Sequence, residues 1–159
     1  MKKYYVHPNI AEAETLPAEF YKSETVFEQL KEKVFVKSWH WLGDENNLIP
    51  LAQSAHPLVL LDQYLSEPIL LIRNVENQVN CFTNVCTHRR NLILHHPSKI
   101  RNLTCMYHGR RFDLDGTFKF MPAFEDAKNF PRPCDSLKQF PLDIPHQQYY
   151  PFSQLLKNI

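Results

Sequence analysis

The stretch CTHRRNLILHHPSKIRNLTCMYHGR, residues 86–110, places two cysteines and four histidines within twenty-five residues. It begins with Cys86-x-His88 and ends with Cys105-x-x-His108-Gly, and sixteen residues separate His88 from Cys105. Two short loops that each offer one thiolate and one imidazole can converge on a shared site. The spacing therefore predicts a metal centre with two cysteine and two histidine ligands.

The ligand set fits one kind of iron–sulfur centre. In a Rieske centre, two histidines replace the two cysteines of one iron of a [2Fe–2S] cluster, so the set is Cys₂His₂. Zinc can use the same four ligands, which leaves a structural zinc domain as an alternative. Structural zinc loops usually space the ligands of a pair by two to four residues, and Cys86-x-His88 is tighter than that. The spacing favours the cluster over zinc, and over four side chains without a metal.

The remaining cysteines and histidines do not fit this site. His95 and His96 lie beside Pro97 in a polar, turn-like segment between the two loops, which predicts that they are solvated. Cys81 lies in an alternating segment and Cys134 in a proline-rich one. Both are interpreted as small apolar fillers rather than as ligands or a disulfide pair.

Composition limits the class of protein. A chain of 159 residues with 43% apolar and 22% charged residues is typical of one soluble globular domain. The formal charge of +1 gives no reason to expect nucleic acid or an anionic membrane as partner. No apolar run approaches the roughly 20 residues that cross a membrane. The first residues lack the apolar core of a secretory signal, so a cytoplasmic, reducing location is expected for the four cysteines.

Hydrophobic periodicity predicts a mostly antiparallel β domain with an N-terminal helix. A capping box at Thr25 to Glu28 precedes apolar residues at helical spacing, which predicts a helix at about 26–39. Short apolar or alternating runs predict strands, and 121–136 is a proline-punctuated loop with room for one helical turn. The expected strands are 56–62, 68–73 and 78–83, a hairpin over 111–120 around Asp115-Gly116, and 137–144.

The segment NVCTHRRNLILHHPSKIRNLTCMYHGRRFDLDGTF, residues 84–118, resembles the Rieske domain of ring-hydroxylating oxygenase α subunits, and the resemblance extends over about 20–144. It implies a Rieske-type antiparallel β sandwich or barrel with a cluster-binding subdomain of two hairpin loops. It also implies that Cys86 and Cys105 bind one iron and that His88 and His108 bind the other. We therefore expect an N-terminal arm at 1–19, the Rieske domain at 20–144 (cluster-binding part about 84–122) and a tail at 145–159.

Three positions distinguish this chain from the high-potential Rieske proteins of respiratory complexes. Those proteins resemble this motif but carry a disulfide between the loops, at positions occupied here by Asn91 and Tyr107. They also place a serine that hydrogen-bonds a cluster sulfide where this chain has Arg110. Fewer hydrogen bonds to sulfur stabilise the reduced cluster less. A potential at the low end of the roughly −150 to +300 mV Rieske range is therefore expected, and a value above about +100 mV would contradict it.

The chain also departs from the oxygenases that it resembles. Their first loop commonly has glycine at the position of Arg90, and their second has tryptophan at the position of Arg110. Glycine often marks a backbone with positive φ, so Arg90 is expected to strain or reshape its turn. Together with Arg89, these residues are interpreted as a cluster-tuning or docking group, or else as a solvated basic patch.

The expected function is electron transfer. Oxygenases of this kind hold a second, mononuclear iron with two histidines and a carboxylate. After His108 the sequence contains only one more histidine, His146. We therefore expect this chain to lack the mononuclear iron site and to have no catalytic residues of its own. It would pass electrons from a reductase or ferredoxin to an oxygenase catalytic domain; the alternative is a stand-alone Rieske ferredoxin. Two explanations are open for the last residues. They form a short helix that begins near Ser153 in a stand-alone Rieske protein, or they are the end of a truncated gene product.

Overall fold

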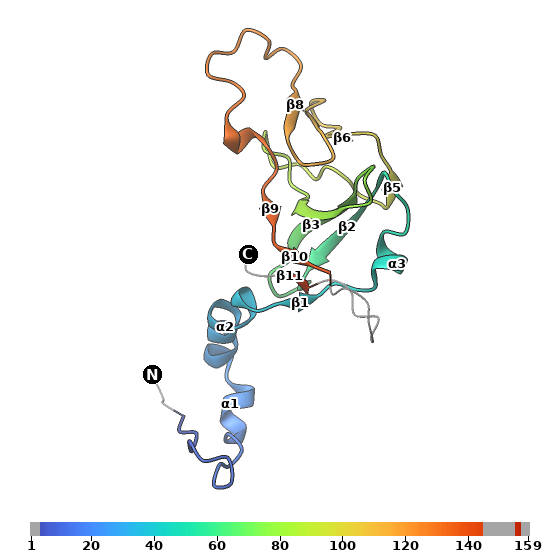
Figure 1. The fold of residues 1–159 in the computed structure, drawn as a ribbon. Coiled ribbons are helices and arrows are strands. Elements are labelled where there is room, and N and C mark those ends of the chain that lie inside the picture. Colours follow the sequence, from blue (N-terminus) through green and yellow to red (C-terminus); the bar gives the residue numbers. More distant parts are fainter. Residues whose placement is uncertain (1–3, 145–154, 157–159) are drawn as a thin grey trace. The chain divides into compact units, whose positions relative to one another are not determined.

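The computed structural model describes residues 4–144 and 155–156 (Figure 1). The chain divides into two compact units, residues 1–37 and 38–159, and each is described by itself. The domain limits expected from the sequence stay a prediction, because compactness does not show where an independently folding domain begins. No helix of the described ranges is long and apolar enough to span a membrane.

The first unit contains two short helices, α1 (Ala18–Lys22) and α2 (Glu24–Lys33), and a 3-10 turn, η1 (Phe35–Lys37). The predicted helix at 26–39 exists, but its limits were wrong. The Ser23 hydroxyl accepts a hydrogen bond from the Val26 N–H at 3.3 Å, so Ser23 rather than Thr25 caps the helix. The helix ends at Lys33, because Val34 has a φ of −119° and the tighter η1 turn follows.

The second unit is built on a five-stranded antiparallel sheet in the order β5-β2-β3-β4-β9 (Figure 1). The three predicted strands at its centre are confirmed with limits shifted by up to two residues, and β3 and β4 form the predicted hairpin. Its strands are β2 (Ser54–Leu60), β3 (Glu67–Arg73), β4 (Val79–Thr83), β5 (Ser98–Lys99) and β9 (Gln139–Phe140).

Strand β3 is buried on both faces, which explains its continuous apolar sequence. On one face, Leu70 and Ile72 belong to a core that also contains both cysteines of the two loops. On the other face, Ile69 and Leu71 belong to a second core. The first core consists of Ala55, Leu70, Ile72, Phe82, Cys86, Ile93, Leu103, Cys105, Phe112 and Leu137. The sheet thus supports the two loops through a packed hydrophobic layer.

Two smaller sheets complete the unit. The first comprises β6 (Leu103–Thr104), β7 (Arg111–Phe112) and β8 (Phe118–Phe120), and β7 and β8 form the predicted hairpin. The second comprises β1 (His40–Trp41), β11 (Leu155–Leu156) and β10 (Leu142–Asp143). A short helix, α3 (Glu45–Leu48), and a 3-10 turn, η2 (Pro133–Asp135), lie between strands. The predicted mostly β, antiparallel fold is confirmed.

Two predictions near the C-terminus need correction. The single strand predicted over 137–144 is divided into β9 and β10, with Pro141 between them. Proline has no N–H to donate to a neighbouring strand, which explains the interruption. The predicted C-terminal helix is wrong for Leu155 and Leu156, which form β11, and its other residues lie outside the described part of the chain.

Candidate metal centre

The two predicted loops, 86–91 and 105–110, have the same backbone hydrogen bonds. In each, the cysteine N–H donates to the carbonyl five residues later, and the N–H four residues later donates back to the cysteine carbonyl. These distances are 2.8 and 3.0 Å in the loop of Cys86, and 2.8 and 2.9 Å in the loop of Cys105. The histidine follows its cysteine by two residues in the first loop and by three in the second. The two turns therefore present their histidines from different positions of one shared backbone frame.

The fourth residue after each cysteine has a left-handed backbone. In the second loop it is Gly109, with a φ of +74°. In the first loop it is Arg90, with a φ of +55°, a conformation that L-residues other than glycine adopt at a cost. The expected positive φ at Arg90 is therefore confirmed, and because both loops keep the same hydrogen bonds, the turn is not reshaped.

We predict that Arg90→Gly stabilises the protein by about 1 kcal/mol, because glycine removes most of the cost of the left-handed conformation, roughly 1–2 kcal/mol, at some loss of chain entropy. Urea unfolding of the purified protein measures the effect. The matched control is Arg89→Gly, since Arg89 is also exposed but has an ordinary φ. Arg89→Gly should destabilise by about 0.5–1 kcal/mol; equal effects of the two variants would contradict the argument.

The structure brings the four predicted residues together as two pairs. Cys86 and Cys105 are 1% and 2% exposed, belong to one core, and interact with each other through their side chains. His88 and His108 are half-buried, with ring centroids 4.7 Å apart and ring planes at 76°. The Asn91 amide donates a 3.8 Å hydrogen bond to the Cys105 Sγ. The thiols thus lie inside the core, and the imidazoles lie closer to the surface.

These donors are suited to an iron–sulfur cluster. The Nδ1 atom of His88 is buried and has no hydrogen-bond partner in the described part of the chain, so it is free to bind a metal. Two thiols and two imidazoles, paired by type, are the donors that a cluster with one Cys₂ iron and one His₂ iron requires. Across residues 4–144 and 155–156, no group of three or more Cys, His, Asp or Glu side chains is arranged to hold one metal ion.

The local environment sets the protonation of these groups. Burial raises the pKa of the Cys86 thiol, a hydrogen bond from the backbone of His88 opposes this, and the neighbouring Cys105 raises it further. Burial lowers the pKa of His88, as do its electrostatic interactions with His108, Arg89 and Arg110. A neutral imidazole is the form that binds a metal, whereas the buried Cys86 thiol needs a bound metal to favour the thiolate.

Aromatic side chains contact the histidine pair. The Tyr107 ring lies 3.9 Å from the His108 ring, and the Phe124 ring lies 6.2 Å from the His88 ring. Phe124 in turn contacts Phe130, at 5.1 Å. Both phenylalanines come from the loop at 121–136, and sequence reasoning missed them because nothing in that loop indicates which way its side chains point. The loop contributes part of the apolar surroundings of His88.

Sequence reasoning also missed a buried ion pair beside the loops. Arg110 is only 3% exposed, so the interpretation as a solvated patch is wrong for this residue, although Arg89 and Arg90 are exposed. Its guanidinium donates a 2.7 Å hydrogen bond to the carboxylate of Asp135 in η2. Its guanidinium carbon also lies 4.9–5.8 Å from the centres of three aromatic rings, those of Phe112, Phe118 and Phe130.

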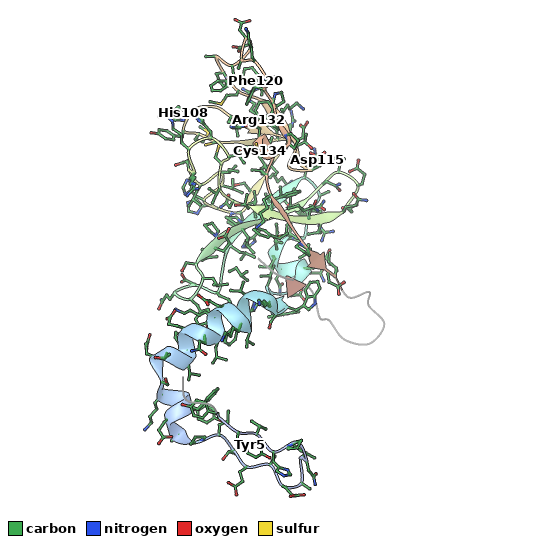
Figure 2. All side chains as sticks on the ribbon, turned by 90° about the vertical axis from the view of Figure 1, so that its left-hand side faces the viewer. Tyr5, His108, Asp115, Phe120, Arg132 and Cys134 are labelled. Atoms are coloured by element: carbon green, nitrogen blue, oxygen red, sulfur yellow. The ribbon has the colours of Figure 1, made fainter. Side chains whose placement is uncertain are left out.

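The remaining candidates lie away from the four donors. His95 and His96 are exposed, as predicted. Cys81 is fully buried in the second core, and burial raises its pKa to about 12, which confirms that it is an apolar filler. The same interpretation of Cys134 is wrong, because η2 leaves this residue exposed. Both are free cysteines. Figure 2 places Cys134 and His108 at the same end of the unit.

Comparison with known proteins gives a consistent result. Residues 44–140 match the Rieske [2Fe–2S] domain. The carnitine monooxygenase oxygenase subunit of Escherichia coli (strain K12) is 36% identical over 123 residues, which cover 77% of this chain and 32% of that protein. The biphenyl 2,3-dioxygenase subunit alpha of Rhodococcus jostii (strain RHA1) is 30% identical over 114 residues, which cover 70% of this chain and 24% of that protein.

A solved structure agrees with these relatives. The crystal structure of a quaternary ammonium Rieske monooxygenase in complex with L-carnitine matches with a TM-score of 0.76 and 26% identity, covering 91% of this chain and 39% of that one. The fold is therefore that of Rieske oxygenase domains. The chain spans about a quarter to a third of the length of the two curated relatives.

Proposed function

Because the chain belongs to the Rieske [2Fe–2S] domain family, whose members carry a cluster of that type, we propose that it is an electron-transfer domain of an oxygenase system. A bound [2Fe–2S] cluster takes up and releases one electron at a time. The observation that carries the proposal is the sorting of the four donors into a buried thiol pair and a half-buried imidazole pair 4.7 Å apart.

The four donors have separate roles in this proposal. Cys86 and Cys105 bind one iron from inside the core, and His88 and His108 bind the other iron. Since the imidazoles are more exposed than the thiols, the histidine side is the side from which electrons enter and leave. The potential is expected in the lower part of the roughly −150 to +300 mV Rieske range.

The proposed partners are chosen by analogy with the relatives. Those proteins are oxygenase subunits, which supports a reductase or ferredoxin as the electron donor of this chain and an oxygenase catalytic domain in the cytoplasm as its acceptor. Mixing the chain with a reductase and NADH tests the donor half of the proposal. Bleaching of the visible absorption on addition of the reductase is the expected result.

The purified chain should be red-brown and contain about two irons and two acid-labile sulfides. Anaerobic titration should take up about one electron per chain, with the electron on a [2Fe–2S] centre by electron paramagnetic resonance. Metal analysis and the titration check this prediction directly. A colourless protein with one zinc per chain would overturn it in favour of a structural zinc domain.

A further inference from the structure

The ion pair between Arg110 and Asp135 is the most deeply buried charged contact described in the second unit. Its two side chains are 4% and 8% exposed, and Arg110 Nη2 lies 2.7 Å from Asp135 Oδ1. The other carboxylate oxygen accepts a 2.7 Å hydrogen bond from the Arg132 backbone N–H. Both oxygens of the carboxylate are therefore used, whereas the Arg110 Nε atom is buried and has no partner among the residues described.

The pair connects both loops of the metal centre. Arg110 is the last residue of the second loop, and its carbonyl accepts the hydrogen bond of the Cys105 N–H at 2.8 Å. Thr87 lies between Cys86 and His88 in the first loop, and its hydroxyl donates a 2.7 Å hydrogen bond to the Asp135 carbonyl. Turn η2 is thereby fixed to the two segments that carry the four donors.

The charge of Arg110 acts on the donors in a weakly screened environment. The guanidinium packs against the Phe130 ring at 5.6 Å, and Phe130 contacts Phe124, whose ring lies 6.2 Å from the ring of the donor His88. The three phenylalanine rings around it exclude water, so its field is screened less than that of a surface arginine. The exposed Arg111, its neighbour in the chain, lacks this enclosure.

Reduction adds one negative charge to a bound cluster, so nearby fixed charges shift its potential. A buried cation stabilises the reduced state and raises the potential, and a buried anion does the reverse. We propose that the charge of Arg110 raises the reduction potential of the cluster. In this proposal Asp135 is a positioning residue, which holds Arg110 in place and offsets part of its charge. This inference rests on the proposed function, since it requires a cluster between the two loops.

The test compares midpoint potentials of Arg110→Gln, Asp135→Asn and the wild-type protein by anaerobic dithionite titration. We expect the potential to fall in Arg110→Gln and to rise in Asp135→Asn, because the two variants remove opposite charges. Arg110→Lys retains the charge and should stay close to the wild type. Arg111→Gln removes a neighbouring exposed charge and should leave the potential unchanged. A merely structural role would not give shifts of opposite sign.

Shifts in the same direction, or no shift in variants that hold a full cluster, would overturn the inference. If Arg110→Gln fails to fold, the midpoint potentials of Asp135→Asn and Arg110→Lys still test the proposal. A potential of Asp135→Asn at or below that of the wild type contradicts the proposal. A higher potential in Asp135→Asn, together with a potential of Arg110→Lys close to that of the wild type, supports it. A wild-type chain without iron and sulfide would instead contradict the proposed function, so the two failures are distinguishable.

Discussion

Replacing Cys105 with serine is expected to remove nearly all iron and sulfide from the purified chain. Iron–sulfur clusters are held by soft thiolate ligands, and a serine hydroxyl is a poor substitute. Cys105 is 2% exposed and shares a core with Cys86, so no solvent ligand can easily replace it. Iron and sulfide analysis together with the visible spectrum measures the loss, from about two irons per chain to almost none.

Two further cysteines provide matched controls. Cys134→Ser changes an exposed cysteine and should leave cluster content and stability unchanged. Cys81→Ser places the same hydroxyl in the second core, at a site that is equally buried. That variant should be less stable but still hold the cluster, which separates the cost of a buried hydroxyl from the loss of a ligand. Wild-type iron content in Cys105→Ser would show that Cys105 is not a ligand.

The convergence of the four proposed donors could be predicted because its sequence signal is local. Each loop carries its cysteine and histidine within four residues, and the structure gives both loops the same backbone frame. The hairpin of β7 and β8 was predictable for the same reason, since a turn such as Asp115-Gly116 between apolar runs specifies its own pairing. The interruption at Pro141 also had a local signal, the missing proline N–H, which the prediction of one strand over 137–144 overlooked.

The surroundings of the donors could not be predicted, because they depend on contacts between distant segments. Arg110 pairs with a residue 25 positions later in the chain. In the sequence it is one of several arginines, and only packing against aromatic rings distinguishes it from exposed Arg89. The cap of α2 was predicted wrongly for a local reason. Ser23 and Thr25 are both suitable caps, and the capping-box pattern favoured Thr25, whereas Ser23 caps the helix.

The second large effect is expected on stability, from Asp135→Asn. Removing one partner of a buried ion pair leaves an uncompensated charge and costs about 3–5 kcal/mol. The guanidinium of Arg110 lies among phenylalanine rings, so water cannot readily solvate it in the variant. Asparagine can still accept the hydrogen bond from the Arg132 N–H, which places the expected loss near about 3 kcal/mol. Urea unfolding measures the change in the free energy of unfolding.

An exposed ion pair of similar geometry provides the control. Lys119 Nζ lies 2.6 Å from Asp113 Oδ1, but these side chains are 55% and 44% exposed. Asp113→Asn should therefore cost less than about 1 kcal/mol. The double variant Arg110→Met with Asp135→Asn should recover part of the loss, since methionine can pack against the rings without a charge. Equal losses of unfolding free energy in Asp113→Asn and Asp135→Asn would show that burial of the Arg110–Asp135 pair contributes nothing to stability.

The same pair determines how stability depends on pH. Burial alone would raise the pKa of Asp135, but the Arg132 N–H and the Arg110 guanidinium outweigh it and hold the pKa below its usual range. A carboxyl whose pKa is lower in the folded than in the unfolded state stabilises fully above its unfolded pKa, and this is lost as pH falls through the folded value. The difference in unfolding free energy between wild type and Asp135→Asn should therefore shrink between about pH 5 and pH 2. A difference that stays constant over this range would mean that the carboxylate is not the stabilising form, and that the pair is held together by its hydrogen bonds rather than by its charges.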